Sequence, residues 1–168
     1  MADLWYDSHE TPIGRFWAAA TDKGLLKVTT TGSEKEFLDS TKSLVDALPV
    51  RDPARFKELF RRLDMYFEGK PVSFSDLDFD LIGTDFQVKV WKAISEIPHG
   101  RVASYRDMAV RAGKPRAVRA AGSAVGDNKL LVVIPCHRVI KSDGSLGGFG
   151  GDTELKRRLL RLEGVKRF

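Results

Sequence analysis

Residues 104–125, with the sequence SYRDMAVRAGKPRAVRAAGSAV, decide how the second half of the chain folds. Ser104 is followed three positions later by an aspartate, an arrangement that caps the start of a short helix. Gly113 can end this helix in the left-handed conformation, and Pro115–Val125 is expected to form the next one, because proline suits a first helical turn. Two helices separated by three or four residues are typical of a helix-turn-helix, whose second helix usually lies in a DNA groove.

The second of these helices combines two arginines with small side chains. Arg116 and Arg119 stand among residues that include Ala120, Gly122 and Ser123. Small side chains let a helix approach another surface closely, and that surface could be the core of the protein or a nucleic-acid groove. The arginines and the preceding turn favour groove contact.

The elements around the helix-turn-helix follow from capping residues and hydrophobic spacing. A helix is expected from Thr84 to about Ile97, because Thr84 opens a capping box. A last helix is expected from Asp152 to Glu163, with leucines on its apolar face and Lys156 and the arginines largely elsewhere. The continuous apolar run Leu130–Ile134 predicts a short buried strand.

The first half of the chain has the pattern of a small antiparallel sheet followed by helices. Residues 1–80 are therefore predicted to form an N-terminal α/β support domain with a linker, and residues 84–168 a mostly helical second domain, giving an α+β fold. The predicted strands are Leu4–Asp7, Ile13–Ala20 and Leu25–Thr30, and the predicted helices are Glu34–Ala47 and Pro53–Phe67.

Charge is divided unequally between the two halves. Residues 1–83 carry 11 basic and 15 acidic side chains, a net charge of −4, whereas residues 84–168 carry 17 and 8, a net charge of +9. The second half is the natural nucleic-acid face, although a solvated basic surface would have the same composition. The absence of a long apolar run indicates a cytoplasmic protein that does not enter membranes. The scarcity of Asn, Gln and Met resembles the composition of heat-adapted proteins.

The chain contains a single cysteine, Cys136, so it cannot form an internal disulfide. The three histidines and this cysteine do not show zinc-binding spacing, and no metal or cofactor is expected. A lone cysteine is usually an inert buried residue. The neighbouring His137 changes this interpretation, because a histidine can generate the nucleophilic thiolate.

Several segments of the second half resemble the O6-alkylguanine-DNA alkyltransferases. The most specific is Pro135-Cys136-His137-Arg138-Val139, and the order of the other segments also matches. These segments are Gly100–Tyr105, Arg116–Ala120, Asn128, Gly147–Gly151 and Leu162–Gly164. The resemblance implies a ribonuclease-H-like N-terminal domain and a winged helix-turn-helix C-terminal domain.

The resemblance also implies a role for each matching residue of the transfer site. Cys136 accepts the alkyl group, and His137 relays the thiol proton through water to Glu163, while Asn128 helps to shape the site. Tyr105 faces the guanine ring. The substrate pocket is implied to contain Val139, Phe149, Gly150 and Gly151, with the Gly150 amide facing O6. Phe149 stands where many relatives carry tyrosine, which puts the preference for bulky alkyl groups in doubt.

DNA binding is implied to occur through the minor groove, after the damaged base has been flipped out of the duplex. Arg119 enters the base stack in its place. The other implied DNA contacts are Arg116, Ala120, Gly122, Ser123, Ser104 and Arg138.

The resulting expectation is a monomer that repairs O6-alkylguanine in double-stranded DNA, with O4-alkylthymine as a further candidate substrate. It does so by one irreversible transfer per molecule, because no second thiol or cofactor could regenerate Cys136. Three alternatives remain open from the residues: a module that binds alkylated DNA without transfer, a cysteine hydrolase, and a helix-turn-helix regulator. The presence of Cys136 argues against the first of these.

Overall fold

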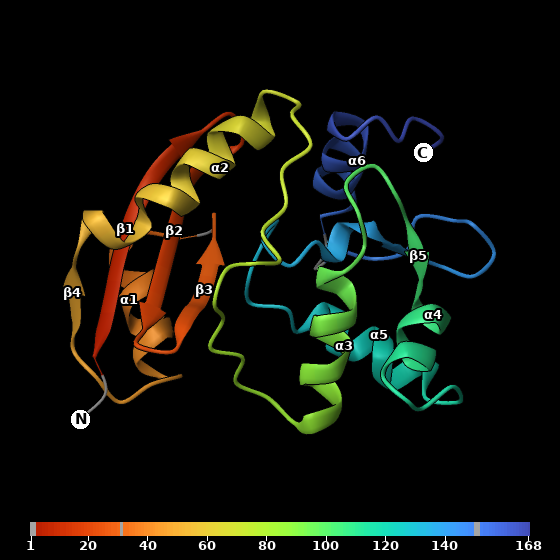
Figure 1. Ribbon diagram of the computed structural model, residues 1–168, viewed down its shortest axis with the longest axis horizontal. Coiled ribbons are helices and arrows are strands. Elements are labelled where there is room, and N and C mark those ends of the chain that lie inside the picture. Colours follow the sequence, from red (N-terminus) through yellow and green to blue (C-terminus); the bar gives the residue numbers. More distant parts are fainter. Residues whose placement is uncertain (1–2, 31, 150–151) are drawn as a thin grey trace. The chain divides into compact units, whose positions relative to one another are not determined.

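The computed structural model describes residues 3–30, 32–149 and 152–168 (Figure 1). The chain is divided into two compact units that exchange short segments of sequence. The first comprises Met1–Glu68, Asp76–Ile82 and Lys129–Leu131, and the second comprises Gly69–Ser75, Gly83–Asn128 and Val132–Phe168. Both helices and strands are present, as expected for an α+β protein. None of the helices formed by the described residues is long and apolar enough to span a membrane.

Four α-helices form most of the second unit: α3 (Asp85–Ser95), α4 (Tyr105–Arg111), α5 (Val118–Gly126) and α6 (Thr153–Leu162). Both predicted capping boxes are confirmed, at Thr84 before α3 and at Ser104 before α4. The indole Nε1 of Trp91 donates a buried hydrogen bond of 2.8 Å to the carbonyl oxygen of Ala124, which joins α3 to α5.

A small parallel pair of strands, β5 (Ala103–Ser104) and β6 (Val139–Ile140), brings the start of α4 beside the end of the cysteine motif. Ala103 pairs with Val139, and Ser104 pairs with Ile140. Strands of two residues have no alternating pattern for a sequence to reveal.

The second helix of the helix-turn-helix is shorter than predicted. It begins at Val118 instead of Pro115, because residues 114–117 form a turn that is closed by a hydrogen bond of 2.9 Å from the amide of Ala117 to the carbonyl of Lys114. Arg116 consequently lies in this turn, while Arg119 lies in the first turn of α5.

The predicted strand at Leu130–Ile134 is wrong, although its burial is as expected. Beyond an isolated bridge at Leu130 the segment forms turns, and Val132 adopts a φ of +67°, which an extended run cannot contain. The side chain of Asn128 donates to the carbonyl of Ile134 over 2.8 Å, so a side chain here replaces a strand partner.

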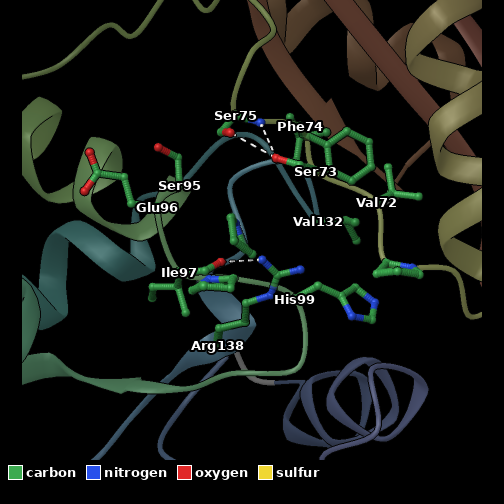
Figure 2. A pocket seen from close by; sticks show the side chains of 14 residues that line it. Val72, Ser73, Phe74, Ser75, Ser95, Glu96, Ile97, His99, Val132 and Arg138 are labelled. Atoms are coloured by element: carbon green, nitrogen blue, oxygen red, sulfur yellow. Dashed lines mark hydrogen bonds between the residues drawn. The ribbon is translucent and has the colours of Figure 1, made fainter.

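The segment Gly69–Ser75 belongs to the second unit, where it helps to enclose a cavity of about 310 Å³ (Figure 2). The other lining residues include Ile97, His99, Pro135 and Arg138, but not Cys136. This cavity therefore adjoins the cysteine motif from the side of Arg138.

The first unit is built on a four-stranded sheet in the order β3-β2-β1-β4. Neighbouring strands β1, β2 and β3 are antiparallel, as predicted, whereas β4 pairs in parallel with β1. The strand β4 has only three residues, too few to give a recognisable pattern. The strands are β1 (Leu4–Thr11), β2 (Gly14–Thr21), β3 (Gly24–Thr29) and β4 (Pro49–Arg51).

Helices α1 (Glu34–Lys42) and α2 (Lys57–Phe67) cover opposite faces of this sheet (Figure 1). Consecutive residues of β2 point to opposite faces, and Trp17 stacks on Phe37 of α1 while Phe16 meets Phe67 of α2 edge to face. A 3-10 turn, η1 (Pro53–Phe56), leads into α2.

The helix α1 ends five residues before its predicted end at Ala47. The hydroxyl groups of Ser40, Thr41 and Ser43 each donate to a carbonyl three residues earlier, at distances of 2.7–2.8 Å. Such side-chain bonds compete with the helical pattern, and Pro49 disfavours helical backbone just before it.

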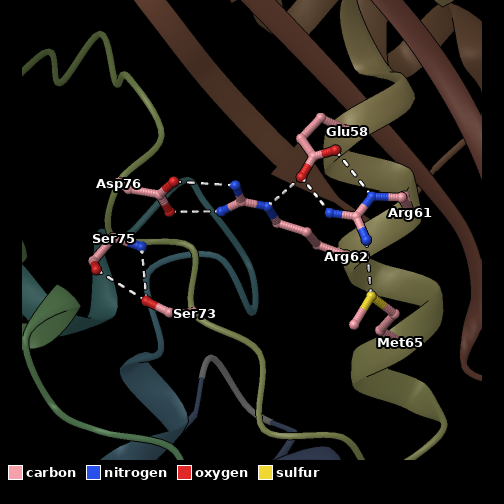
Figure 3. A network of polar contacts seen from close by, with 7 residues as sticks. All are labelled: Glu58, Arg61, Arg62, Met65, Ser73, Ser75 and Asp76. Atoms are coloured by element: carbon pink, nitrogen blue, oxygen red, sulfur yellow. Dashed lines mark hydrogen bonds and ion pairs between the residues drawn. The ribbon is translucent and has the colours of Figure 1, made fainter.

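The segment Asp76–Ile82 returns to the first unit and lies along β3. Leu25 exchanges two backbone hydrogen bonds with it, at 2.9 Å to Asp78 and 2.8 Å from Asp80. Arg62 of α2 holds the beginning of the segment by donating to both carboxylate oxygens of Asp76, at 2.6 and 3.0 Å (Figure 3). Arg62 also donates to Glu58, which extends the contact into a network.

The close contact between β3 and this segment predicts that Gly24→Ala will destabilise the first unit strongly. Gly24 has a φ of +137°, and a Cβ atom there would lie 2.3–2.6 Å from the backbone of Asp78 and Phe79. Gly14→Ala is the matched control, because Gly14 has a φ of +116° but no atom within 4 Å of such a Cβ. We expect a loss of about 1–2 kcal/mol in the free energy of unfolding for the control and at least about twice that for Gly24→Ala. Equal losses in urea unfolding would contradict the prediction.

Candidate functional site around Cys136

Cys136 opens a single 3-10 turn, η2 (Cys136–Arg138), which leads into β6. The amide of Cys136 donates to the carbonyl of Ile134 over 2.8 Å, and the amide of Arg138 donates to that of Pro135 over 2.9 Å. Cys136 is only 7% exposed. A reacting group must therefore be brought into the protein to meet this sulfur.

The side chain beside Cys136 in sequence is part of a buried network. Nε2 of His137 lies 2.5 Å from Oε2 of Glu163, and both side chains are completely buried. The other carboxylate oxygen of Glu163 accepts from Nε of Arg138 at 2.8 Å and from the amide of Gly100 at 3.0 Å. His137 and Glu163, which are 26 positions apart in the sequence, are thus in direct contact.

The charges in this network follow from burial and hydrogen bonding. Burial alone raises the pKa of Glu163, but hydrogen bonds and charge from His137 and Arg138 outweigh it and hold that pKa well below its usual range. Burial lowers the pKa of His137, although Glu163 opposes this effect. Glu163 is therefore ionised, and His137 is neutral. Because a carboxylate can only accept, Nε2 carries the imidazole proton and Nδ1 is the basic nitrogen.

The thiol itself lies in an environment that disfavours its charge. Burial raises the pKa of Cys136, while a hydrogen bond from Asn128 and the charge of Lys156 act in the opposite direction. Asn128 also binds the carbonyl of Ile134, so its amide is fixed next to the sulfur. The thiolate consequently requires assistance from its neighbours, which the side-chain amide of Asn128, the backbone amide of His137 and the ammonium group of Lys156 supply.

The start of α4 and the loop at Gly147–Phe149 form another part of the site. The hydroxyl of Tyr105 donates to the carbonyl of Gly148 at 3.5 Å, and Gly147 approaches the Tyr105 ring so closely that a Cβ atom would lie 2.9 Å from the hydroxyl oxygen. Val139 is fully buried and Phe149 is half-buried. Gly150 and Gly151, which were also predicted to line the pocket, lie outside the described residues.

The helix-turn-helix presents most of its predicted contact residues to solvent. Arg119, Ala120 and Ser123 are exposed on α5, and Arg116 is exposed in the turn before it. Gly122 is half-buried. The hydroxyl of Ser104 accepts from the amide of Asp107 at 3.0 Å and thereby caps α4. An exposed face of small residues and arginines is therefore present.

The prediction that Arg138 contacts DNA is wrong. Its side chain is 7% exposed, forms the ion pair with Glu163, and donates from Nη1 to the carbonyl of Ile97 over 2.6 Å (Figure 2). A guanidinium group committed to two buried acceptors cannot reach a DNA backbone. Arg138 instead compensates the charge of Glu163 and ties the motif to the end of α3.

Lys156 is a site residue that the sequence analysis missed. It was assigned to the polar side of α6, but it is completely buried, and its Nζ donates to the carbonyls of Val139 at 2.6 Å and Gly148 at 3.1 Å. Its spacing of seven residues from Glu163, which puts both on one helical face, was the available signal.

The buried Glu163 network predicts a characteristic pH dependence of stability. We expect Glu163→Gln to lower the free energy of unfolding near neutral pH by about 3 kcal/mol, because it leaves Arg138 buried without a counter-charge. The folded pKa of Glu163 is below the unfolded value of about 4.3, so its contribution is present above that value and is lost as the pH falls through the folded pKa. The difference from wild type should therefore shrink below about pH 4.

Urea unfolding at a series of pH values would measure this difference. Glu154→Gln is the matched control, because Glu154 lies on the same helix but its side chain is 73% exposed and pairs with Arg157 on the surface. The control should change stability little at any pH. A Glu163→Gln difference that is small at neutral pH, or that persists undiminished in acid, would contradict the predicted network.

Comparison with known proteins identifies the family. Residues 4–81 match the ribonuclease-like domain, and residues 85–165 the DNA binding domain, of 6-O-methylguanine DNA methyltransferase. A methylated-DNA--protein-cysteine methyltransferase of Methanosarcina barkeri is 43% identical, and the match covers 95% of this chain and 97% of that relative. One from Haemophilus influenzae is 36% identical, covering 98% and 89%. A crystal structure of Mycobacterium tuberculosis OGT in complex with DNA is 35% identical with a TM-score of 0.79, covering 96% and 94%. The chain therefore belongs to the 6-O-methylguanine DNA methyltransferase family.

Proposed function

We propose that the protein repairs alkylated DNA directly, by transferring the alkyl group of O6-alkylguanine to Sγ of Cys136. The observation that carries this proposal is the buried sulfur in the turn that also positions His137 against Glu163. The family membership supports it, because relatives that match nearly the whole chain are named methylated-DNA--protein-cysteine methyltransferases.

The chemistry requires a nucleophilic sulfur and a leaving oxygen. In our proposal the thiol proton passes towards His137, either directly or through water, and the sulfur electron pair forms a bond to the alkyl carbon. The bond from that carbon to O6 breaks, and its electron pair stays with the guanine, which takes up a proton. Asn128 and Tyr105 position the sulfur and the base, while Val139 and Phe149 border the pocket.

The product at Cys136 is an uncharged thioether. The chain has no second cysteine that could displace the alkyl group, so each molecule acts once. The protein is thus a transferase by reaction and a stoichiometric reagent in use. The same attack would apply to O4-alkylthymine, which also carries its alkyl group on an exocyclic oxygen.

DNA is the partner that the second part of the chain is suited to bind. We propose that residues 84–168 carry binding and transfer, with their net charge of +9 facing phosphates, while residues 1–80 support them. The duplex base must be flipped out to reach a sulfur this deeply buried, and Arg119 takes its place in the stack. Arg116, Ala120, Gly122, Ser123 and Ser104 lie along the DNA backbone. We place this activity in the cytoplasm and assign it to a monomer.

The first test is the mass of the protein after reaction. Incubation with a duplex containing one O6-methylguanine should add one methyl group to the peptide that contains Cys136, with an equal loss from the DNA. Cys136→Ser should bind the same duplex and remain unmodified. A wild-type protein that binds this DNA while its mass stays unchanged would instead indicate a module that recognises damage without transfer.

The second test concerns Arg119 and compares it with a neighbouring arginine. Arg119→Ala should slow repair of duplex DNA by about tenfold or more, because the flipped state costs a few kcal/mol and loses its stacking substitute. Repair of single-stranded DNA should be nearly unchanged. Arg116→Ala removes the same charge from the preceding turn, and should weaken binding to both substrates similarly. Single-turnover rates on the two substrates measure this, and equal ratios for the two variants would refute the role of Arg119.

A further inference from the structure

Lys156 is a fully buried ammonium group, which is an unusual residue to find inside a small protein. It lies in α6 between Asp152, which caps the helix, and the buried leucines Leu159 and Leu160. Seven residues separate it from Glu163, so both point from the same face of α6. This helix consequently delivers one cation and one anion to the region of Cys136.

The contacts of Lys156 do not by themselves explain why a charge is buried. Its Nζ donates to the carbonyls of Val139 and Gly148, and within the described residues no carboxylate lies within salt-bridge distance of it. Two neutral acceptors compensate poorly for the hydration that a buried ion loses. A methionine would fill the same space without that cost.

The group with which the charge of Lys156 can interact is the sulfur of Cys136. Nζ of Lys156 binds the carbonyl of Val139, the residue that follows the Cys136 turn, and both side chains are buried, so the charge lies near the sulfur. In keeping with this position, Lys156 lowers the pKa of Cys136, and Cys136 raises the pKa of Lys156. Burial nevertheless lowers the pKa of Lys156 to about 8. At neutral pH the group is therefore largely protonated, and it carries its charge when a thiolate forms.

The same ammonium group also fixes the loop next to the sulfur. Nζ lies 5.8 Å from the centre of the Tyr105 ring, and the carbonyl of Gly148 accepts from both Lys156 and the Tyr105 hydroxyl. The loop is thereby tied to α4 and α6 by one oxygen atom. Through Val139, Lys156 is tied to the residue that follows η2 as well.

We propose that Lys156 is a positioning residue for alkyl transfer: its buried ammonium group joins Gly148 to Val139 and supplies the positive charge that stabilises the thiolate of Cys136. This inference rests on the proposed function for its use in repair, but the charge effect itself exists without DNA. His137 removes the thiol proton, and Lys156 stabilises the resulting thiolate of Cys136 in its buried site. The other groups near the sulfur are the phenol of Tyr105 from α4, the side-chain amide of Asn128 after α5 and the backbone amide of His137 in η2.

The experiment uses the fact that Cys136 is the only thiol in the chain, so thiolate absorbance reports on it alone. We would titrate the wild type, Lys156→Gln, Lys156→Met and Lys156→Arg without DNA. Glutamine keeps a donor for the two carbonyls but removes the charge, whereas arginine keeps the charge. Arg158→Met removes an equal charge from the exposed side of the same helix and serves as the control.

We expect the glutamine and methionine variants to reduce the thiolate fraction at neutral pH by about tenfold, equivalent to a rise of about one unit in the pKa of Cys136. The arginine variant and the control should titrate like the wild type. If Lys156→Met does not fold, the comparison of Lys156→Gln with Lys156→Arg still shows whether the charge lowers the pKa of Cys136. A folded Lys156→Gln protein that titrates like the wild type would overturn the proposal.

Single-turnover transfer then tests whether the effect matters for repair. Lys156→Gln should transfer methyl groups about tenfold more slowly at neutral pH and recover as the pH rises, since the thiolate fraction recovers. A purely structural defect would lower the rate equally at all pH values and would overturn the proposal. If the wild type itself transfers nothing, the proposed function fails, whereas the thiol titration still judges the role of Lys156.

Discussion

The carboxylate of Glu163 is the group on which the second unit depends. It accepts hydrogen bonds from His137, Arg138 and the amide of Gly100, and so joins the end of α6, the cysteine motif and the loop after α3. Because the side chains of Glu163, His137 and Arg138 are buried, none of them can exchange its partner for water without a large cost in free energy. The orientation of the imidazole beside Cys136 therefore follows from the same contacts that hold the unit together.

The helix α6 is the element that organises charge around the sulfur. One of its faces carries Lys156 at one end and Glu163 at the other, with leucines between them. Glu163 is neutralised by Arg138, while burial lowers the pKa of His137 and leaves it uncharged and able to accept a proton. Among the described residues no carboxylate neutralises Lys156, so its positive charge acts on the neighbouring Cys136. A single amphipathic helix thus sets the protonation state of the base and the electrostatic environment of the nucleophile.

The sequence allows prediction of the features that depend on local rules. The capping boxes at Thr84 and Ser104 need only residues three positions apart, and the acceptor cysteine was found from its immediate neighbours. The features that were missed depend on tertiary contacts. Arg138 was assigned to DNA by resemblance alone, and Lys156 was placed away from the leucine face of its helix. Only the folded structure shows that each of these side chains donates a hydrogen bond to a buried carbonyl oxygen.

The cost of building this site is carried by a few residues of the second unit. Val132 holds a left-handed backbone conformation, Lys156 is a buried cation, and the ion pair of Glu163 with Arg138 has lost its hydration. Each arrangement is fixed by contacts within the protein, so little reorganisation is needed when negative charge develops on the sulfur. A multiple-turnover enzyme must also reopen such a site to release its product. A protein that keeps the alkyl group on its own cysteine releases the repaired base only once and never has to restore a free thiol, which makes a rigid acceptor site compatible with its function.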